Sequence, residues 1–327
     1  MRSRTSAAET ATPIRVVIVT MDTHLASSVN RAHNTLMREF PGLTLSLHAA
    51  SEFAGHPQAL ARCKADIAQG DIIVAGMIFL EDHFLPILDD LRARREHCDA
   101  MICMASASEV VKLTRLGHFD MDKPASGPMA LLKKLRGNKD KKATGGAAQM
   151  KMLRRLPQLL RFIPGTAQDV RAYFLTMQYW LGGSDENMLN LVRHVIDRGA
   201  AGPRRALRGQ VRVQAPVDYP ELGVYHPRLG DTIAARLTED AGRLPKPQGL
   251  PAGQPVRGTV GVLVLRSYLL SRNAGHYDGV IAALESRGLR VIPAFASGLD
   301  SRPAIEKYFM NDGRPVVDAV VSLTGFS

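Results

Sequence analysis

The chain has 327 residues, of which 45% are hydrophobic and 22% charged, and its formal net charge is +11. This composition is typical of a globular protein, and the length predicts two domains or slightly more. No run approaches the roughly 18 apolar residues of a membrane span, so we expect no transmembrane segment. Three cysteines are too few and too irregularly spaced for a disulfide framework or a zinc site, and they favour a reducing cytoplasm.

The first part of the chain predicts a leader followed by an α/β domain. Residues 1–13 are polar and small, without the apolar core of a secretory signal, and we interpret them as a disordered leader. Ile14 to Thr20 is a β-branched run interrupted only by Arg15, which indicates a strand buried on both faces. Further strands are expected at 43–49 (more exposed, near an edge), 71–76 and 100–105, with helices at about 22–39, 57–68, 81–97 and 106–116. The alternation over 14–116 predicts a parallel sheet with a flavodoxin-like strand order.

The pattern changes after Leu116. Residues 117–149 are rich in Gly and Lys and predict a basic linker or loop, and 150–255 predict a helical and irregular connector with helices near 150–163, 166–182 and 184–197. Residues 256–327 predict the start of a second α/β domain, with strands at 259–265, 289–295 and 316–323 and helices at 274–287 and 302–310. A three-stranded parallel sheet buries little surface, so we expect the natural protein to continue after this truncated domain.

Several long segments together resemble the large (H) subunit of magnesium chelatase. They occur in the same order along nearly the whole chain, which makes the resemblance far more specific than a short motif. The segments are VVIVTMDTHL (Val16–Leu25), MQYWLGGSDENML (Met177–Leu189), YPELGVYH (Tyr219–His226), Arg266–Asp300 with HYDGV and RVIPAFASGLD, and DAVVSLTGFS (Asp318–Ser327).

The resemblance implies an enzyme subunit that binds protoporphyrin IX and its substrate ion Mg²⁺. In this family two smaller subunits of the AAA+ type hydrolyse ATP to drive Mg²⁺ insertion, the first committed step toward chlorophyll or bacteriochlorophyll. ATP is therefore expected on the partners and not on this chain. The family protein is several times longer and carries its main porphyrin pocket in the later body, so this N-terminal fragment is not expected to be competent alone.

Two alternatives stay open. The related large subunit of aerobic cobaltochelatase, from cobalamin biosynthesis, shares the second α/β region, although the first unit and YWLGGSDEN look more like the magnesium enzyme. The region could instead be a regulatory or docking module for partner subunits. Between Lys133 and Arg161 ten basic residues stand against one acid, Asp140, which suits an acidic partner or a solvated loop. Without interleaved aromatic residues or a known module, specific nucleic-acid binding is not expected.

The candidate substrate-cavity residues are grouped in the second α/β region. They are Arg266, His276, Tyr277, Asp278 and Thr324. Arg266 directly follows the strand predicted at 259–265, His276 to Asp278 begin the next predicted helix, and Thr324 directly follows the strand predicted at 316–323. The carboxyl edge of a parallel sheet is where ligands commonly bind. Within a chelatase, an imidazole or carboxylate could take pyrrole protons, and Arg266 could pair with a propionate. The alternative is that His276 and Asp278 only cap their helix. No catalytic residue and no metal site are assigned.

The first unit offers weaker candidates. His24 and Asp22 follow the first strand, but Asp22 and Thr23 are equally good helix caps. No G-x-G-x-x-G follows this strand, so a dinucleotide site has no support. Gly182 to Asn187 resembles an anion-binding turn, yet its acids argue against phosphate, and Ser184 as a helix cap explains it better. Trp180 is expected to be a packing anchor.

Overall fold

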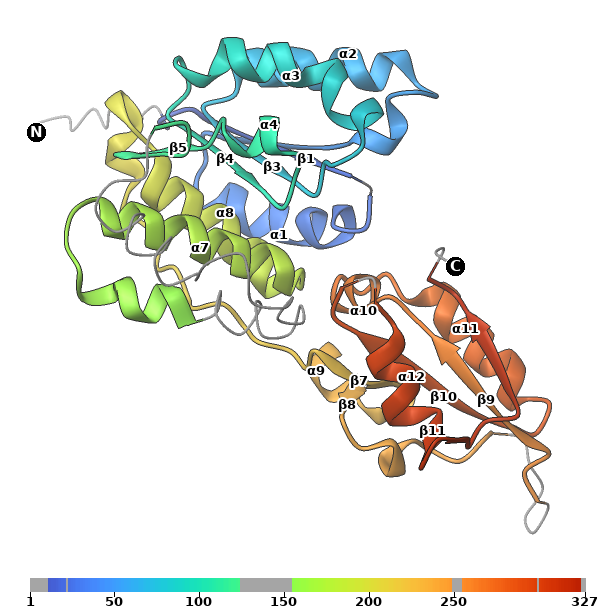
Figure 1. Ribbon diagram of the computed structural model, residues 1–327. Helices are drawn as coiled ribbons and strands as arrows, with labels where there is room; N and C mark the ends of the chain where they lie inside the picture. The colour runs from blue at the N-terminus through green and yellow to red at the C-terminus, as the bar shows by residue number, and fades with distance from the viewer. Residues whose placement is uncertain (1–10, 22, 124–154, 249–254, 299, 325–327) are drawn as a thin grey trace, which may run out of the picture. The chain divides into compact units, whose positions relative to one another are not determined.

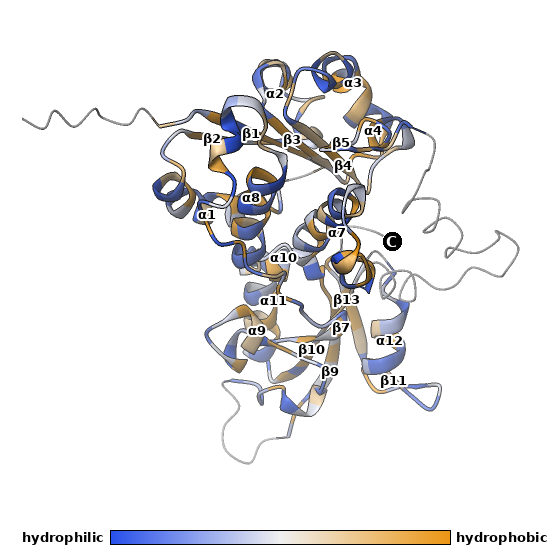
Figure 2. Ribbon diagram, turned by 90° about the vertical axis from the view of Figure 1, so that its left-hand side faces the viewer, coloured by the Kyte–Doolittle hydropathy of each residue, from blue (hydrophilic) through white to orange (hydrophobic). Residues whose placement is uncertain are grey.

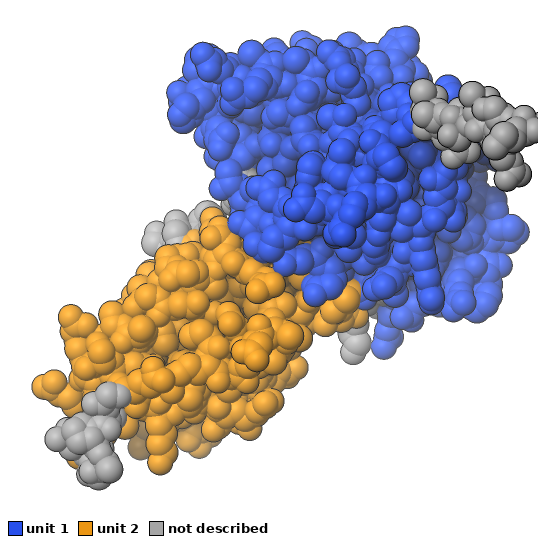
Figure 3. Space-filling model, turned by 180° about the vertical axis from the view of Figure 1, so that it is seen from behind, with its two compact units in different colours: residues 1–181, 185–216 blue, residues 182–184, 217–327 orange. Residues whose placement is uncertain are grey.

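The computed structural model describes residues 11–21, 23–123, 155–248, 255–298 and 300–324. They form two compact units, of which unit 1 comprises Met1–Leu181 and Asp185–Pro216, and unit 2 comprises Gly182–Ser184 and Val217–Ser327 (Figures 1 and 3). The predicted leader up to residue 10 and the predicted linker from residue 124 lie outside the described residues. Among the helices described, none has the length and apolar character needed to cross a membrane.

Unit 1 is built on a sheet with a parallel centre, as the alternating pattern predicts. Its parallel strands lie in the order β2-β1-β3-β4, which is the expected flavodoxin-like order for these four. Arg15 is the exposed residue of an otherwise buried strand, and β2 is the half-exposed edge. The bounds are β1 Ile14–Thr20, β2 Leu43–Ala49, β3 Ile72–Gly76 and β4 Ala100–Met104.

Helices cover both faces of this sheet because its strands are apolar on both sides. Val16 and Ile18 face a core that includes residues of α1 (Ala26–Glu39), α7 (Thr166–Gly182) and α8 (Asp185–Gly199). Val17 and Val19 face the core under α2 (Pro57–Gln69) and α3 (Glu81–Arg95). Figure 2 shows the strands in orange between these helices. The helices that the sequence placed in a connector, α7 and α8, therefore pack into unit 1.

The free edge of β4 is covered by a short hairpin, where the sequence predicted a helix through Leu116. That helix is only α4, Ser108–Val111, and it is followed by β5 (Arg115–Leu116) and β6 (Phe119–Asp120). β5 lies antiparallel to β4, and Gly117 makes the turn with a φ of +58°. The sheet therefore extends past the predicted boundary at 116, and an antiparallel hairpin stands where the end of a helix and the start of a linker were expected.

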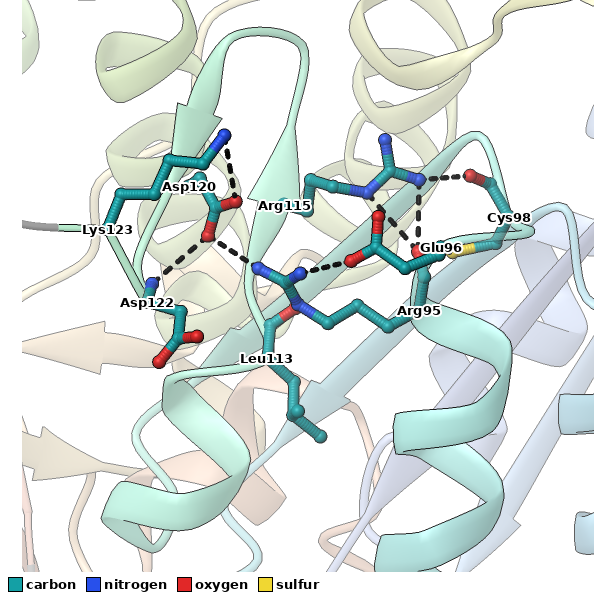
Figure 4. Close-up of polar contacts among 8 residues, drawn as sticks. All are labelled: Arg95, Glu96, Cys98, Leu113, Arg115, Asp120, Asp122 and Lys123. Carbon is teal, nitrogen blue, oxygen red and sulfur yellow. Dashed lines mark hydrogen bonds and ion pairs between the residues drawn. The ribbon is translucent and has the colours of Figure 1, made fainter.

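Hydrogen bonds and an ion pair of Arg95 and Arg115 connect this hairpin to the end of α3 (Figure 4). Arg115 donates to the carbonyl oxygens of Arg95 (3.0 Å), the last residue of α3, and of Cys98 (2.5 Å), three residues later. Arg95 donates to Asp120 at 2.5 Å and to the carbonyl oxygen of Leu113 at 3.2 Å. Because these arginine contacts join the hairpin to the end of α3, we interpret the cluster as a structural one that protects the sheet edge.

A second structural cluster lies at the amino edge of the same sheet. Asp99, next to the start of β4, accepts hydrogen bonds from Arg204 (2.8 and 2.9 Å) and from the backbone N–H of Ala201 (2.8 Å). Arg204 also lies 3.2 Å from Asp71. These contacts tie the segment after α8 to the sheet, which explains why it belongs to unit 1.

Unit 2 contains a five-stranded mixed sheet in the order β13-β9-β10-β7-β8. The parallel strands are β9 (Gly258–Leu263), β10 (Leu289–Ala296) and β13 (Ala319–Ser322), as predicted apart from their ends. The sequence missed β7 (Leu222–Tyr225) and β8 (Leu237–Thr238), which add an antiparallel edge. The expectation of a three-stranded sheet is therefore wrong, because part of the predicted irregular connector pairs with β10.

The helices of unit 2 lie on opposite faces of its sheet. α11 (Gly275–Glu285) packs on the face that carries Val262 and Tyr225, and α12 (Arg302–Tyr308) packs on the face that carries Val224 and Ala294. A helix that the sequence did not predict, α10 (Arg266–Leu270), follows β9 directly. A small hairpin, β11 (Met310–Asn311) and β12 (Arg314–Pro315), precedes β13 and shortens the strand predicted from Val316.

The remaining elements are short helical segments of three to six residues. They are η1 (Ala50–Glu52), η2 (Leu160–Phe162), η3 (Gly202–Leu207), η4 (Pro227–Leu229), α9 (Ile233–Arg236) and η5 (Ala241–Arg243).

Candidate functional site

The candidate residues of unit 2 lie where its parallel strands end. Leu263 of β9 pairs with Ala294 of β10 and with Ser322 of β13, so these strands end at one edge of the sheet. Arg266 begins α10, and His276, Tyr277 and Asp278 occupy the first turn of α11. Thr324 follows β13. The five residues therefore share one edge, the usual position of a ligand site in an α/β sheet.

Arg266 holds the chain in front of β7. Its Nε donates to the carbonyl oxygen of Pro220 at 2.7 Å, and its Nη2 donates to that of Tyr219 at 3.0 Å. Both acceptors are backbone atoms two or three positions before Leu222, where β7 begins. Arg266 thus fixes the entry to the antiparallel strand, which is a structural use of the side chain that the sequence did not reveal.

His276 is part of an aromatic cluster. Its ring centroid lies 3.9 Å from that of Tyr277 with a tilt of 47°, and 5.6 Å from that of Tyr268 in an edge-to-face arrangement. Tyr277 is buried, with 1% of its surface exposed, whereas His276 is exposed. The imidazole therefore sits on a buried aromatic base, which presents a flat polar ring at the edge of the sheet.

Tyr277 connects α11 to the end of β9. Its hydroxyl oxygen accepts a hydrogen bond from the backbone N–H of Leu265 at 3.2 Å. Burial raises the pKa of this phenol, so it stays protonated at neutral pH. This contact fixes the first turn of α11 against the strand end, and it sets the place from which His276 projects.

Asp278 accepts a hydrogen bond of 2.7 Å from the hydroxyl of Tyr225, a residue of β7. Burial raises the pKa of Tyr225, and the hydrogen bond to Asp278 adds to this effect. In the sequence, Tyr225 stands out only as part of the segment Tyr219–His226 and not as a candidate site residue. The structure makes it the group that orients the carboxylate of Asp278.

Thr324 has a different neighbour. Its Oγ1 lies 3.0 Å from the Oγ of Ser322, the last residue of β13. The described contacts therefore join His276, Tyr277 and Asp278 to Tyr268 and Tyr225, while Arg266 and Thr324 share the sheet edge and bind other groups.

A buried charged cluster at the opposite end of α11 was missed. Glu285 is 4% exposed and accepts hydrogen bonds from Arg228 at 2.8 and 2.9 Å. The Nε2 of His226 lies 3.2 Å from Glu285, and its Nδ1 accepts the backbone N–H of Arg228, which assigns the proton to Nε2. Burial lowers the pKa of His226, while Glu285 opposes this shift. The available signal was Glu285 four residues after Ile281, on the buried face of the helix.

The candidates of unit 1 have mainly structural surroundings. α8 begins at Asp185, directly after Ser184, and Asp185 accepts two hydrogen bonds from Arg31 at 2.7 and 2.8 Å. Trp180 is a packing anchor as expected, because its ring lies against Gly76 at the end of β3. His24 follows β1 and is 8% exposed, whereas Asp22 lies outside the described residues. Within the described part of the chain, no cluster of three or more His, Cys, Asp or Glu could hold a metal ion.

Two family models together match nearly the whole chain, but the boundary between them lies within α7 and not between the two units. Residues 177–327 match the family described as CobN/Magnesium Chelatase, and residues 15–174 match a domain of unknown function, DUF3479. The catalytic subunit of cobaltochelatase from Mycobacterium tuberculosis is a distant structural neighbour, with a TM-score of 0.41 and 14% identity over 94% of this chain and 18% of that one.

Curated relatives give a closer match. The chain is 49% identical to the magnesium-chelatase H subunit of Cereibacter sphaeroides and 46% identical to that of Rhodobacter capsulatus, over 95% of its own length and 25% of theirs. It is 31% identical to the chloroplastic magnesium-chelatase protein ChlH of Oryza sativa, over 96% of this chain and 23% of that protein. The chain is therefore similar to large magnesium-chelatase subunits over nearly its whole length, and its residues 177–327 match the CobN/magnesium chelatase family. It spans about a quarter of the length of the large magnesium-chelatase subunits that it matches.

Proposed function

We propose that this chain acts as part of the porphyrin-binding subunit of a magnesium chelatase, which inserts Mg²⁺ into protoporphyrin IX with ATP hydrolysed by two smaller AAA+-type subunits. The observation that supports this most strongly is the 49% identity to a large magnesium-chelatase subunit over 95% of the chain. The reaction belongs to chlorophyll or bacteriochlorophyll synthesis, and we place it in the cytoplasm. Because the chain covers a quarter of these relatives, the proposal gives it a share in the site and not the whole activity.

The carboxyl edge of unit 2 is the proposed contribution to the substrate cavity. A tetrapyrrole is a flat aromatic ring with carboxylate arms, and His276 on its tyrosine base offers a ring for stacking. Asp278 and His276 are groups that can accept protons, and Tyr225 orients the former. Arg266 is the cation at this edge that suits a propionate. No residue is assigned the proton abstraction itself.

Cobalt insertion into a corrinoid is the alternative within the family. The description of the matched family includes CobN. The relatives at 49%, 46% and 31% identity are all magnesium-chelatase subunits, which favours magnesium.

A porphyrin titration of the chain tests the proposal. A water-soluble protoporphyrin analogue is added, and binding is followed by quenching of Trp180, the single tryptophan, and by the porphyrin absorbance. We expect saturable binding that His276→Ala weakens by about threefold to tenfold, the usual value of an aromatic contact. His118→Ala, which removes an exposed imidazole in unit 1, is the matched control and should bind as the parent does. A folded parent chain that binds no porphyrin contradicts the proposed cavity.

A further inference from the structure

A short helical segment of unit 1 is apolar on both of its sides. Residues 155–159 are helical and continue into η2. Leu156 and Leu160 are 5% and 3% exposed, and Leu160 belongs to the core of unit 1, whereas Leu159 and Phe162 are 63% and 84% exposed. Large apolar side chains that are exposed beside polar ones, on a segment whose other side is already buried, are unusual for a surface that faces only solvent. The outer side of this segment, beside α7 in Figure 1, therefore has the character of a surface that another molecule covers.

The segment is held in a fixed shape by α7. The side-chain amide of Gln168 donates to the carbonyl oxygen of Leu160 at 2.8 Å and to that of Ile163 at 2.5 Å. The Nε of Arg171 donates to the carbonyl oxygen of Pro157 at 3.0 Å. These side chains replace solvent at the backbone of the turn, so Phe162 is displayed from a preorganised support and loses little conformational freedom on binding.

The exposed side chains combine apolar and cationic character. Leu159 and Phe162 are joined by Ile163, which is 38% exposed, and the Arg161 guanidinium lies 5.8 Å from the centre of the Phe162 ring. Arg155 is also exposed, and the sequence from Arg155 to Gln168 contains no Asp or Glu. Aromatic and arginine side chains held together in this way are typical of the residues that carry most of the energy of protein–protein interfaces.

We propose that this surface, formed by Leu159, Phe162, Ile163, Arg155 and Arg161, is a docking site for a partner protein with an apolar pocket bordered by carboxylates. The inference rests on the proposed function, in which the partner is one of the two smaller chelatase subunits. Phe162 enters the pocket, and the two arginines pair with its acidic rim. A membrane surface is the competing occupant, and the flotation measurement below distinguishes it from a protein partner.

Binding of the full chain to each purified smaller subunit tests the docking site, at low and at high salt. Phe162→Ala should weaken binding about tenfold or more at both salt concentrations, because it removes the apolar anchor. Arg161→Glu should weaken binding mainly at low salt, because it reverses a steering charge. Leu85→Ala, which changes another exposed apolar residue, on α3, and Arg205→Glu, which changes an exposed arginine after α8, are the matched controls and should bind within about twofold of the parent.

Three results would overturn the inference. The first is that the folded parent binds porphyrin but neither subunit, and the second is that Phe162→Ala binds a subunit as the parent does. The third is that Phe162→Ala instead abolishes self-association on size exclusion, or flotation with phosphatidylglycerol vesicles, with subunit binding unchanged. The porphyrin titration on the same variants separates the two proposals. A Phe162→Ala variant that keeps porphyrin binding and loses subunit binding supports both the docking site and the cavity. A parent chain that binds the subunits but no porphyrin supports the docking site and contradicts the proposed cavity.

Discussion

The hydroxyl of Tyr225 donates a hydrogen bond of 2.7 Å to the carboxylate of Asp278, which joins the last residue of β7 to the first turn of α11. Tyr225 is fully buried, and burial together with this bond raises the pKa of the phenol. The phenol is therefore a permanent donor at neutral pH. β7, a strand that the sequence did not predict, thus orients the carboxylate of Asp278, which the sequence did propose as a site residue.

Tyr225→Phe is expected to lower the free energy of unfolding by about 1–3 kcal/mol, because a hydrogen bond to a charged group is lost. Urea unfolding followed by circular dichroism measures the change. Asp278→Ala and the double variant complete a thermodynamic cycle, in which we expect a coupling of at least about 0.5 kcal/mol. Additive effects would show that the two side chains do not act on each other.

Stability should fall in mild acid because of His194. The Nε2 of this α8 residue lies 3.1 Å from the carbonyl oxygen of Ala172 on α7. Burial lowers the pKa of the imidazole from 6.5 to about 4. Below pH 6.5 the imidazole of His194 is therefore protonated in the unfolded chain but not in the folded chain. The free energy of unfolding decreases as the pH falls, until the pH reaches about 4. The loss between about pH 7 and about pH 5 should be about 2 kcal/mol.

Urea unfolding at both pH values, with the parent and with His194→Gln, isolates this contribution. The variant should lose less stability on acidification than the parent, and His118→Gln should behave as the parent does. A proton NMR titration of the parent keeps the test decisive if the variant does not fold. An imidazole of His194 that titrates near 6.5 in the folded chain would contradict the expectation.

The cysteines should be unreactive in the folded chain. Cys63, Cys98 and Cys103 are all buried. Burial raises the pKa of Cys63 to about 12, with a further contribution from Asp66, and burial also raises the pKa of Cys98 and of Cys103. Because the thiolate is the reactive form, Ellman's reagent at about pH 8 should modify none of them until denaturant is added. Rapid modification of the native chain would show that one of these thiols is accessible.

Gly76→Ala should disturb the contact between β3 and α7. A Cβ at Gly76 would lie 2.7 Å from a ring atom of Trp180, which is closer than a side chain can tolerate. We expect a loss of about 1–3 kcal/mol in the free energy of unfolding and a changed tryptophan emission spectrum. Gly55→Ala, where the new Cβ would meet no atom within 4 Å, is the control. Equal stability of both variants would mean that the indole can move aside at no cost.

The sequence predicted the parts of the fold that depend on local pattern. The run around Arg15 indicated a buried strand because one charge in seven residues leaves both faces apolar, and the structure confirms this. The strands β5, β6 and β8 have two residues each, too few to show a period of two. β7 contains Gly223 and lies between prolines, so its sequence is typical of a turn, and only its pairing with β10 makes it a strand.

The candidate site shows the same division. Arg266, His276 and Thr324 could be placed at one edge because parallel strands end together. The partners of Arg266 could not be predicted, because they are the backbone carbonyls of Tyr219 and Pro220, 47 and 46 positions away. Tyr225 and Asp278 are 53 positions apart, so no local pattern connects them.

α11 is attached to neighbouring residues of the chain at both of its ends. Tyr225 holds Asp278 near the start of the helix, and His226 contacts Glu285 in the last turn, about 10 Å further along the axis. Contacts at both ends fix the direction of the helix axis, whereas a contact at one end alone would let the helix tilt. The orientation of the His276 imidazole therefore depends in part on the buried charged cluster at the far end of the helix. A substitution of Glu285 should change that orientation, although Glu285 lies in the last turn of α11 and His276 in the first.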